Sequence, residues 1–81
     1  MEFNDYCELP YTIEIIPETD NLYFVAIKEL PGCMSMGDSI KDAIKMIEDA
    51  KRVWLRDALR NGEKIPIPLN NEKTLVIKGN K

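Results

Sequence analysis

The side chains that could carry chemistry in this sequence are fourteen acidic residues and two cysteines, and there is no histidine. Hydrolysis at neutral pH needs a general base, paired carboxylates or an activated nucleophile, and histidine is the usual base. Glu14 is predicted to point away from the core, and Glu18 and Asp20 lie in a turn, so no carboxylate cluster of the kind that a metal-dependent nuclease needs is predicted. Cys7 and Cys33 are too few for a disulfide scaffold and lack zinc-binding partners. We therefore expect a protein without cofactor or metal that acts by binding and not as an enzyme.

The charge balance argues against direct binding of nucleic acid. Eleven basic and fourteen acidic residues give a net charge of -3, which weakly repels a phosphate backbone. The local basic stretch of Lys51, Arg52, Arg56 and Arg60 is interpreted as the solvent face of a helix. The four glycines are used by turns, a helix end and the tail, so no phosphate-binding loop is predicted.

No segment is predicted to cross or enter a membrane. The apolar stretches are far shorter than the ~20 residues that span a bilayer, and Met1 to Asp5 lacks the basic start and apolar core of a signal peptide. We expect a cytoplasmic protein.

Period-two alternation of apolar residues indicates strands in the first half of the chain. Pro17 is expected to end the first strand, because proline cannot donate to a sheet. Leu30-Pro31-Gly32 is typical of a type II turn, since proline fixes φ at the first corner and glycine accepts the positive φ of the second. The predicted strands cover 11–16, 22–28, 33–36 and, as a last edge strand, 74–78.

A long amphipathic helix of about 22 residues, between Ser39 and Asn61-Gly62, is the clearest pattern. Ser39 is a good N-cap, Asp42 favours the first turn, and Asn61-Gly62 ends the helix. The apolar stripe contains Ile40, Ala43, Ile44, Ile47, Ala50, Trp54, Ala58 and Leu59. The predicted fold class is α+β, with a three-stranded antiparallel meander packed on one long helix and an extended C-terminal segment with an edge strand (β-β-β-α-β).

One helix can cover only one face of this sheet, so the other face is expected to meet a second subunit, the tail or a partner protein. Strand 22–28 is apolar on both sides, and 33–36 adds methionines. The predicted oligomer face consists of Leu22, Phe24, Met34 and Met36, and we expect a homodimer or a higher homo-oligomer.

Residues 11–68 resemble the HicB-like antitoxin family. The matching features are Tyr23 to Val25, Leu30-Pro31-Gly32-Cys33, Gly37-Asp38-Ser39, Trp54-Leu55 and the exit from Gly62 to Pro68. The Leu-Pro-Gly-Cys motif, followed at this distance by Gly-Asp-Ser and a long helix, is specific in combination. The resemblance implies a degenerate ribonuclease H fold without its catalytic carboxylates. It also implies a partner, a small basic HicA-type toxin that cleaves mRNA.

Two departures from the family pattern affect these expectations. The glycines usual in the first turn are replaced by Asn21-Leu22, and Asn21 is expected to adopt the left-handed conformation. Many members carry a DNA-binding domain at the C-terminus, whereas the tail 69–81 shows no helices of such a domain. We expect a single domain over 1–81, with a core at 11–68 and no direct binding of promoter DNA by this chain.

The residues predicted to contact a toxin are Glu29, Leu30, Pro31 and Asp38, which lie near the motif. Glu29 and Asp38 are expected to be exposed acids. The alternatives are a solvated strand end for Glu29 and a capping role for Asp38. For Trp54, packing in the core is favoured over anchoring a ligand. The competing interpretation of the whole chain is a stand-alone oligomeric module that binds a ligand or has a structural role, without a toxin. A residual nuclease is a third alternative.

Overall fold

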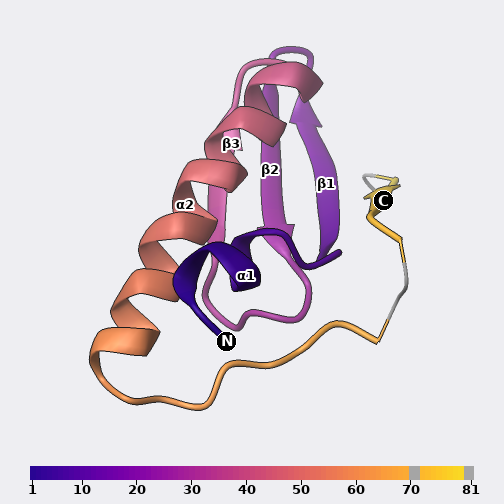
Figure 1. The fold of residues 1–81 in the computed structure, drawn as a ribbon. Coiled ribbons are helices and arrows are strands. Elements are labelled where there is room, and N and C mark those ends of the chain that lie inside the picture. Colours follow the sequence, from indigo (N-terminus) through magenta and orange to yellow (C-terminus); the bar gives the residue numbers. More distant parts are fainter. Residues whose placement is uncertain (70–71, 80–81) are drawn as a thin grey trace.

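A computed structural model describes residues 1–69 and 72–79. The elements are α1 Phe3–Cys7, β1 Thr12–Thr19, β2 Leu22–Ile27, β3 Met34–Gly37, α2 Ile40–Arg60 and β4 Thr74–Ile77. The sheet has the strand order β3-β2-β1-β4, and α2 lies along one of its faces with α1 beside it (Figure 1). The predicted α+β class and the β-β-β-α-β order are confirmed, and α1 is an addition that the sequence patterns did not indicate.

The face of the sheet that α2 covers holds most of the core. Ile13 lies opposite Ile27 and Ile15 lies opposite Val25, and all four side chains are buried. Full burial of an aliphatic side chain of this size contributes about 1.5 to 3 kcal/mol. The same core cluster includes Tyr11, Leu30, Cys33, Ala43, Ile47, Leu55, Ala58 and Ile65.

Strand β1 continues through Pro17 to Thr19, so the prediction that Pro17 ends it is wrong. The N–H of Lys78 donates to the carbonyl oxygen of Ile15 at 2.8 Å. The backbone polar groups of Ile15, and of Pro17 two residues later, therefore face the side of β4. Because β4 pairs no further along β1 than Ile15, the missing N–H of Pro17 falls at an unpaired edge, where proline is tolerated.

The turn between β1 and β2 corrects a second expectation. Asn21 is not left-handed, because the residues with positive φ in the described part of the chain are both glycines. The pairing register shifts between Pro17 and Thr19, and Thr19 lies opposite Leu22. Such a bulge increases the local twist of the strands. Asp20 and Asn21 therefore reverse the chain without a left-handed residue.

Helix α2 begins and ends where the sequence predicts. The hydroxyl oxygen of Ser39 accepts a hydrogen bond from the backbone N–H of Asp42 at 3.0 Å, which satisfies one of the free donors of the first turn. At the other end Gly62 has a φ of 69°, the conformation that commonly ends a helix. Leu59 was predicted in the apolar stripe but is 37% exposed, because it lies about 100° around the helix from buried Ala58.

Lys51 was interpreted as part of the solvent face, but it is only 3% exposed. Its ammonium donates to the carbonyl oxygen of Cys7 at 3.0 Å and pairs with Glu48 at 2.9 Å. Cys7 ends α1, where carbonyl groups have no partner within the helix. The buried ammonium therefore joins α1 to α2. The guanidinium of Arg56 adds a second contact, 4.7 Å from the centre of the Phe3 ring.

The close approach of α2 to β3 depends on Gly37, the last residue of β3. A Cβ atom at this position would lie 2.5 Å from the backbone nitrogen of Ala43 and 2.6 Å from its Cα. Real Cβ atoms essentially never show such distances, and backbone atoms cannot move aside as a flexible side chain can. A side chain at Gly37 would therefore push the first turn of α2 away from the sheet.

The segment after α2 passes one end of the sheet and reaches its opposite edge (Figure 1). There β4 pairs with β1 in parallel, which confirms the predicted edge strand. Residues 70–71 and 80–81, which belong to the predicted tail 69–81, lie outside the described residues. Neither helix in the described part of the chain is long and apolar enough to cross a membrane.

Candidate partner-binding site

The predicted turn at 30–32 is present. The N–H of Cys33 donates to the carbonyl oxygen of Leu30 at 3.0 Å, and Gly32 has a φ of 82°, as the second corner of a type II turn requires. Leu30 and Cys33 are buried, whereas Pro31 and Gly32 are exposed. Both ends of the turn are thus anchored in the core, and its tip presents Pro31 to solvent.

The four predicted contact residues do not form one patch. Glu29 is half-buried, not exposed as expected, and its carboxylate accepts hydrogen bonds from the backbone N–H of Thr12 at 2.9 Å and from its hydroxyl at 2.8 Å. Leu30 lies in the core. Pro31 and Asp38 are exposed but flank opposite ends of β3, a strand of four residues. Glu29 and Leu30 hold the turn in place, and contact of these four residues with a partner stays a prediction.

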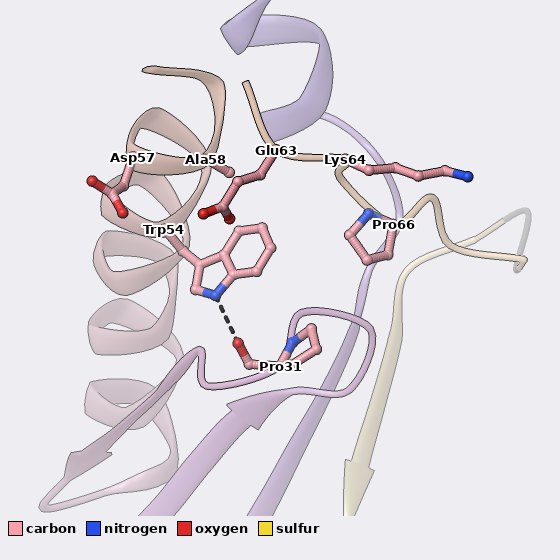
Figure 2. Close-up of a pocket in the computed structure, with 7 residues that line it drawn as sticks. All are labelled: Pro31, Trp54, Asp57, Ala58, Glu63, Lys64 and Pro66. Atoms are coloured by element: carbon pink, nitrogen blue, oxygen red, sulfur yellow. Dashed lines mark hydrogen bonds between the residues drawn. The ribbon is translucent and has the colours of Figure 1, made fainter. Parts of the chain in front are cut away.

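A pocket of about 400 Å³, which we call the Trp54 pocket, opens beside Pro31, where the turn, α2 and the segment after α2 meet (Figure 2). The indole N–H of Trp54 donates to the carbonyl oxygen of Pro31 at 2.8 Å, which fixes the ring against the turn. Figure 2 shows the carboxylate of Glu63 beside the indole and the side chain of Lys64 directed away from it. The lining residues are Pro31, Trp54, Asp57, Ala58, Glu63, Lys64 and Pro66.

Trp54 belongs both to the core and to this pocket. It is half-buried and packs against the core cluster. Core packing, which the sequence favoured, therefore describes one side of the Trp54 ring. A second hollow of about 430 Å³ also has Trp54 and Asp57 in its lining, together with Gly32, Cys33, Met34, Ala50 and Val53. We call the two hollows together the Trp54 groove. The spacing along α2 predicted that Trp54 lies on the inner stripe but could not show that neighbouring segments leave part of it open.

Tyr11 fixes one wall of the groove. Its hydroxyl donates to the carbonyl oxygen of Pro66 at 2.7 Å, and the side chain is 2% exposed. Burial, with smaller electrostatic contributions from Tyr6, Glu29 and Cys7, raises the pKa of Tyr11 from 10.0 to about 12. The phenol is therefore protonated and available as a donor at neutral pH. This contact joins residues 55 apart in sequence, and no local pattern indicated it.

The groove offers binding surface and no nucleophile. Burial raises the pKa of the Cys33 thiol from 9.0 to about 11, although nearby Lys51 opposes the shift. A protonated, buried thiol is a poor nucleophile and a poor metal ligand. In the described part of the chain, no group of three or more histidine, cysteine, aspartate or glutamate residues could hold a metal ion.

The face of the sheet opposite α2 is uncovered by described residues and carries the predicted oligomer face. Phe24 pairs with Met36, and Ala26 with Met34, so their side chains share this face. Leu22, Met34 and Met36 are 37%, 51% and 46% exposed. The uncovered face is present as predicted, and its role in forming an oligomer stays a prediction.

Comparison with known proteins agrees with the resemblance seen in the sequence. A family model described as a HicB-like antitoxin of bacterial toxin–antitoxin systems matches residues 11–78, a range that contains the sheet, α2 and the whole Trp54 groove. A UPF0150 protein of Thermoplasma acidophilum is 34% identical over 58 residues, which cover 72% of this chain and 84% of that protein. No solved structure matches significantly. The chain therefore belongs to the HicB-like antitoxin family of bacterial toxin–antitoxin systems.

Proposed function

We propose that this protein is an antitoxin that binds and neutralises a small, basic, mRNA-cleaving toxin of the HicA type. The observation that carries the proposal is the family match over residues 11–78. The net charge of -3 and the absence of histidine support a binder of a basic protein, because opposite charge speeds encounter and favours the correct partner. The protein acts by occupying the toxin and not by catalysis, in the cytoplasm, where mRNA is available to such a toxin.

We assign the Trp54 groove to toxin binding. Tryptophan is enriched among the residues that dominate binding energy, particularly where it lines a pocket. The groove lies beside the exposed tip of the Leu30-Pro31-Gly32 turn, and Asp57 and Glu63 give its rim acidic groups. Pro31, one of the predicted contact residues, lines this groove. Asp38 lies at the other end of β3 and would contact a toxin only if the interface extends along that strand.

The test begins with the tagged, full-length protein as bait in extract of its native cells. We expect it to retain a small basic protein. That protein, purified alone, should cleave mRNA, and an equimolar amount of the present chain should stop the cleavage. Inhibition is the decisive measurement, because co-purification alone does not show an antitoxin.

A matched pair of variants locates the inhibition on the surface. Pro31→Lys adds a positive charge to the exposed wall of the groove, and Asn4→Lys adds the same charge at an exposed position in the N-terminal region. We expect Pro31→Lys to weaken inhibition and Asn4→Lys to leave it unchanged, and both should stay folded, with melting temperatures lowered by no more than a few degrees. Failure of the wild-type chain to inhibit any captured ribonuclease would overturn the antitoxin proposal.

We also propose that the uncovered face of the sheet packs against a second copy of the chain. The supporting observation is the set of exposed apolar side chains at Leu22, Met34 and Met36, since exposed apolar patches of this kind mark interaction sites. A symmetric pair would bury the same patch on both copies. Light scattering should then give a dimer for the wild type and a monomer for Met36→Lys. Met46→Lys, at an exposed position on α2, should stay dimeric.

The same measurement bears on the alternative of a stand-alone oligomeric module. A stable oligomer that captures no ribonuclease would favour that alternative over the antitoxin. A wild-type monomer would leave the uncovered face to the toxin or to the tail and would contradict the proposed dimer.

A further inference from the structure

The carboxylate of Glu63 is free of ion pairs and hydrogen bonds with the residues that the structure describes, although it lines a pocket next to an aromatic ring. Figure 2 shows it beside the indole of Trp54, between the helix and the exit segment. The side chain of the neighbouring Lys64 extends away from the ring, and it forms no ion pair with Glu63. The carboxylate of Asp57, on the same rim, accepts a long hydrogen bond of 3.4 Å from the side-chain amide of Asn61. The pocket therefore has negative charge available for a ligand.

The ring beside Glu63 is held by a hydrogen bond and by packing against the core. Its N–H is satisfied by the carbonyl oxygen of Pro31, so the indole has no unmet polar group and offers its π surface. The rings of Pro31 and Pro66 add apolar walls, and the hydroxyl of Tyr11 holds Pro66 in place. A fixed aromatic face lined by prolines, with a carboxylate at its edge, is complementary to a cation on an apolar stem.

A contact between a cation and an aromatic ring is present elsewhere in the chain, because the guanidinium of Arg56 lies over the ring of Phe3. In the Trp54 pocket, the cation has to come from another molecule, because the lysine that lines the pocket points away. Anionic ligands are disfavoured by Asp57 and Glu63. A purely apolar ligand would gain nothing from the carboxylate of Glu63, which lies at the exposed rim.

We infer that the Trp54 pocket receives one arginine side chain of the toxin, stacked on the indole and paired with the carboxylate of Glu63. Arginine fits better than lysine because its planar guanidinium can stack on the ring and donate sideways to a carboxylate at the same time. A pocket of about 400 Å³ has room for the guanidinium and its stem. The identity of the partner rests on the proposed antitoxin function, whereas the preference for a guanidinium rests on the pocket alone.

The first measurement needs no toxin. The chain has one tryptophan, so a single indole N–H signal in the NMR spectrum reports on the pocket. Titration with acetyl-arginine amide should shift this signal saturably, whereas acetyl-citrulline amide, which has nearly the same shape without the charge, should not. Glu63→Gln should remove most of the response to arginine, and Glu8→Gln should leave it unchanged. Equal responses to the two ligands, or no response to arginine, would overturn the inference.

The second measurement uses the toxin captured above. Glu63→Gln should weaken toxin binding about tenfold or more, as expected for the loss of a charge-assisted hydrogen bond, without a change in melting temperature. Each arginine of the toxin is then replaced by alanine, and each toxin variant is tested against the wild-type chain and against Glu63→Gln. One of these replacements should weaken binding to the wild-type chain but have little further effect on binding to Glu63→Gln. Unchanged binding by Glu63→Gln would refute the arginine site but leave the antitoxin function standing. A toxin that fails to bind the wild-type chain would instead refute the antitoxin function.

Discussion

Replacing Lys51 by methionine tests the connection between α1 and α2. Methionine keeps most of the buried stem but removes the ammonium, which donates to the carbonyl oxygen of Cys7 at 3.0 Å and pairs with Glu48 at 2.9 Å. A hydrogen bond to a charged group contributes about 1.5 to 3 kcal/mol, and leaving its buried partner unsatisfied costs about 1 to 3 kcal/mol. The Glu48 side chain is 28% exposed, so water compensates much of its loss. We expect the free energy of unfolding to fall by about 2 to 4 kcal/mol.

Urea denaturation followed by the fluorescence of Trp54, the only tryptophan, measures this change. A domain of this size has a total stability of about 4 to 12 kcal/mol. With a urea slope near the low end of the usual range, about 1.5 kcal/mol per molar, the midpoint should fall by about 2 M. Lys45→Met removes an exposed lysine of the same helix and should change the stability by less than about 0.5 kcal/mol.

The comparison between the two lysines decides the matter. If Lys51→Met is no less stable than Lys45→Met, the buried ammonium does not stabilise the contact between α1 and α2. Native-state hydrogen exchange gives an independent readout. Relative to the wild type, Lys51→Met should accelerate exchange of the α1 amides more than that of the α2 amides.

Three further outcomes are expected. Gly37→Ala should lower the free energy of unfolding by about 1 to 3 kcal/mol, because the new Cβ would lie 2.5 Å from the Ala43 backbone nitrogen. Urea denaturation measures this change, with Gly79→Ala as the control, because a Cβ at Gly79 would have nothing within 4 Å. Stability should fall as the pH rises from 10 to about 12, because Tyr11 keeps its proton in the folded state while the unfolded phenol ionises at its ordinary pKa of 10.0; Tyr11→Phe should lack this part of the alkaline loss. The Cys33 thiol, with its pKa raised to about 11, should resist iodoacetamide at neutral pH until urea unfolds the chain, and rapid modification of the native protein in peptide maps would contradict its burial.

Local chemistry accounts for the parts of the fold that the sequence predicted well. The N-cap at Ser39, the end of α2 at Gly62 and the turn at 30–32 each depend on conformational preferences of a few adjacent residues. Period-two alternation likewise predicted the buried and uncovered faces of β1 and β2. These elements needed no knowledge of distant contacts.

The wrong expectations concern residues whose role depends on a neighbouring element. Pro17 stays in β1 because β4 ends before reaching it, and Asn21 avoids positive φ because the bulge before it supplies the twist. Lys51 was placed on the solvent face because α1, five residues long, gave no recognisable periodic signal. Once α1 packs there, burial of a charged side chain with its partners becomes favourable.

Sequence alone determined that the chain lacks histidine, carries net negative charge, folds as a sheet with one long helix and resembles HicB-like antitoxins. Tertiary structure alone decided that Trp54, Pro31, Glu63 and Pro66 meet in one pocket. The physical reason is that periodicity and turn preferences describe a residue relative to its own element. The position of one element against another depends on packing between residues far apart in the chain, such as Tyr11 and Pro66. A binding pocket formed by a turn, a helix and an extended segment is therefore visible only after those elements have packed.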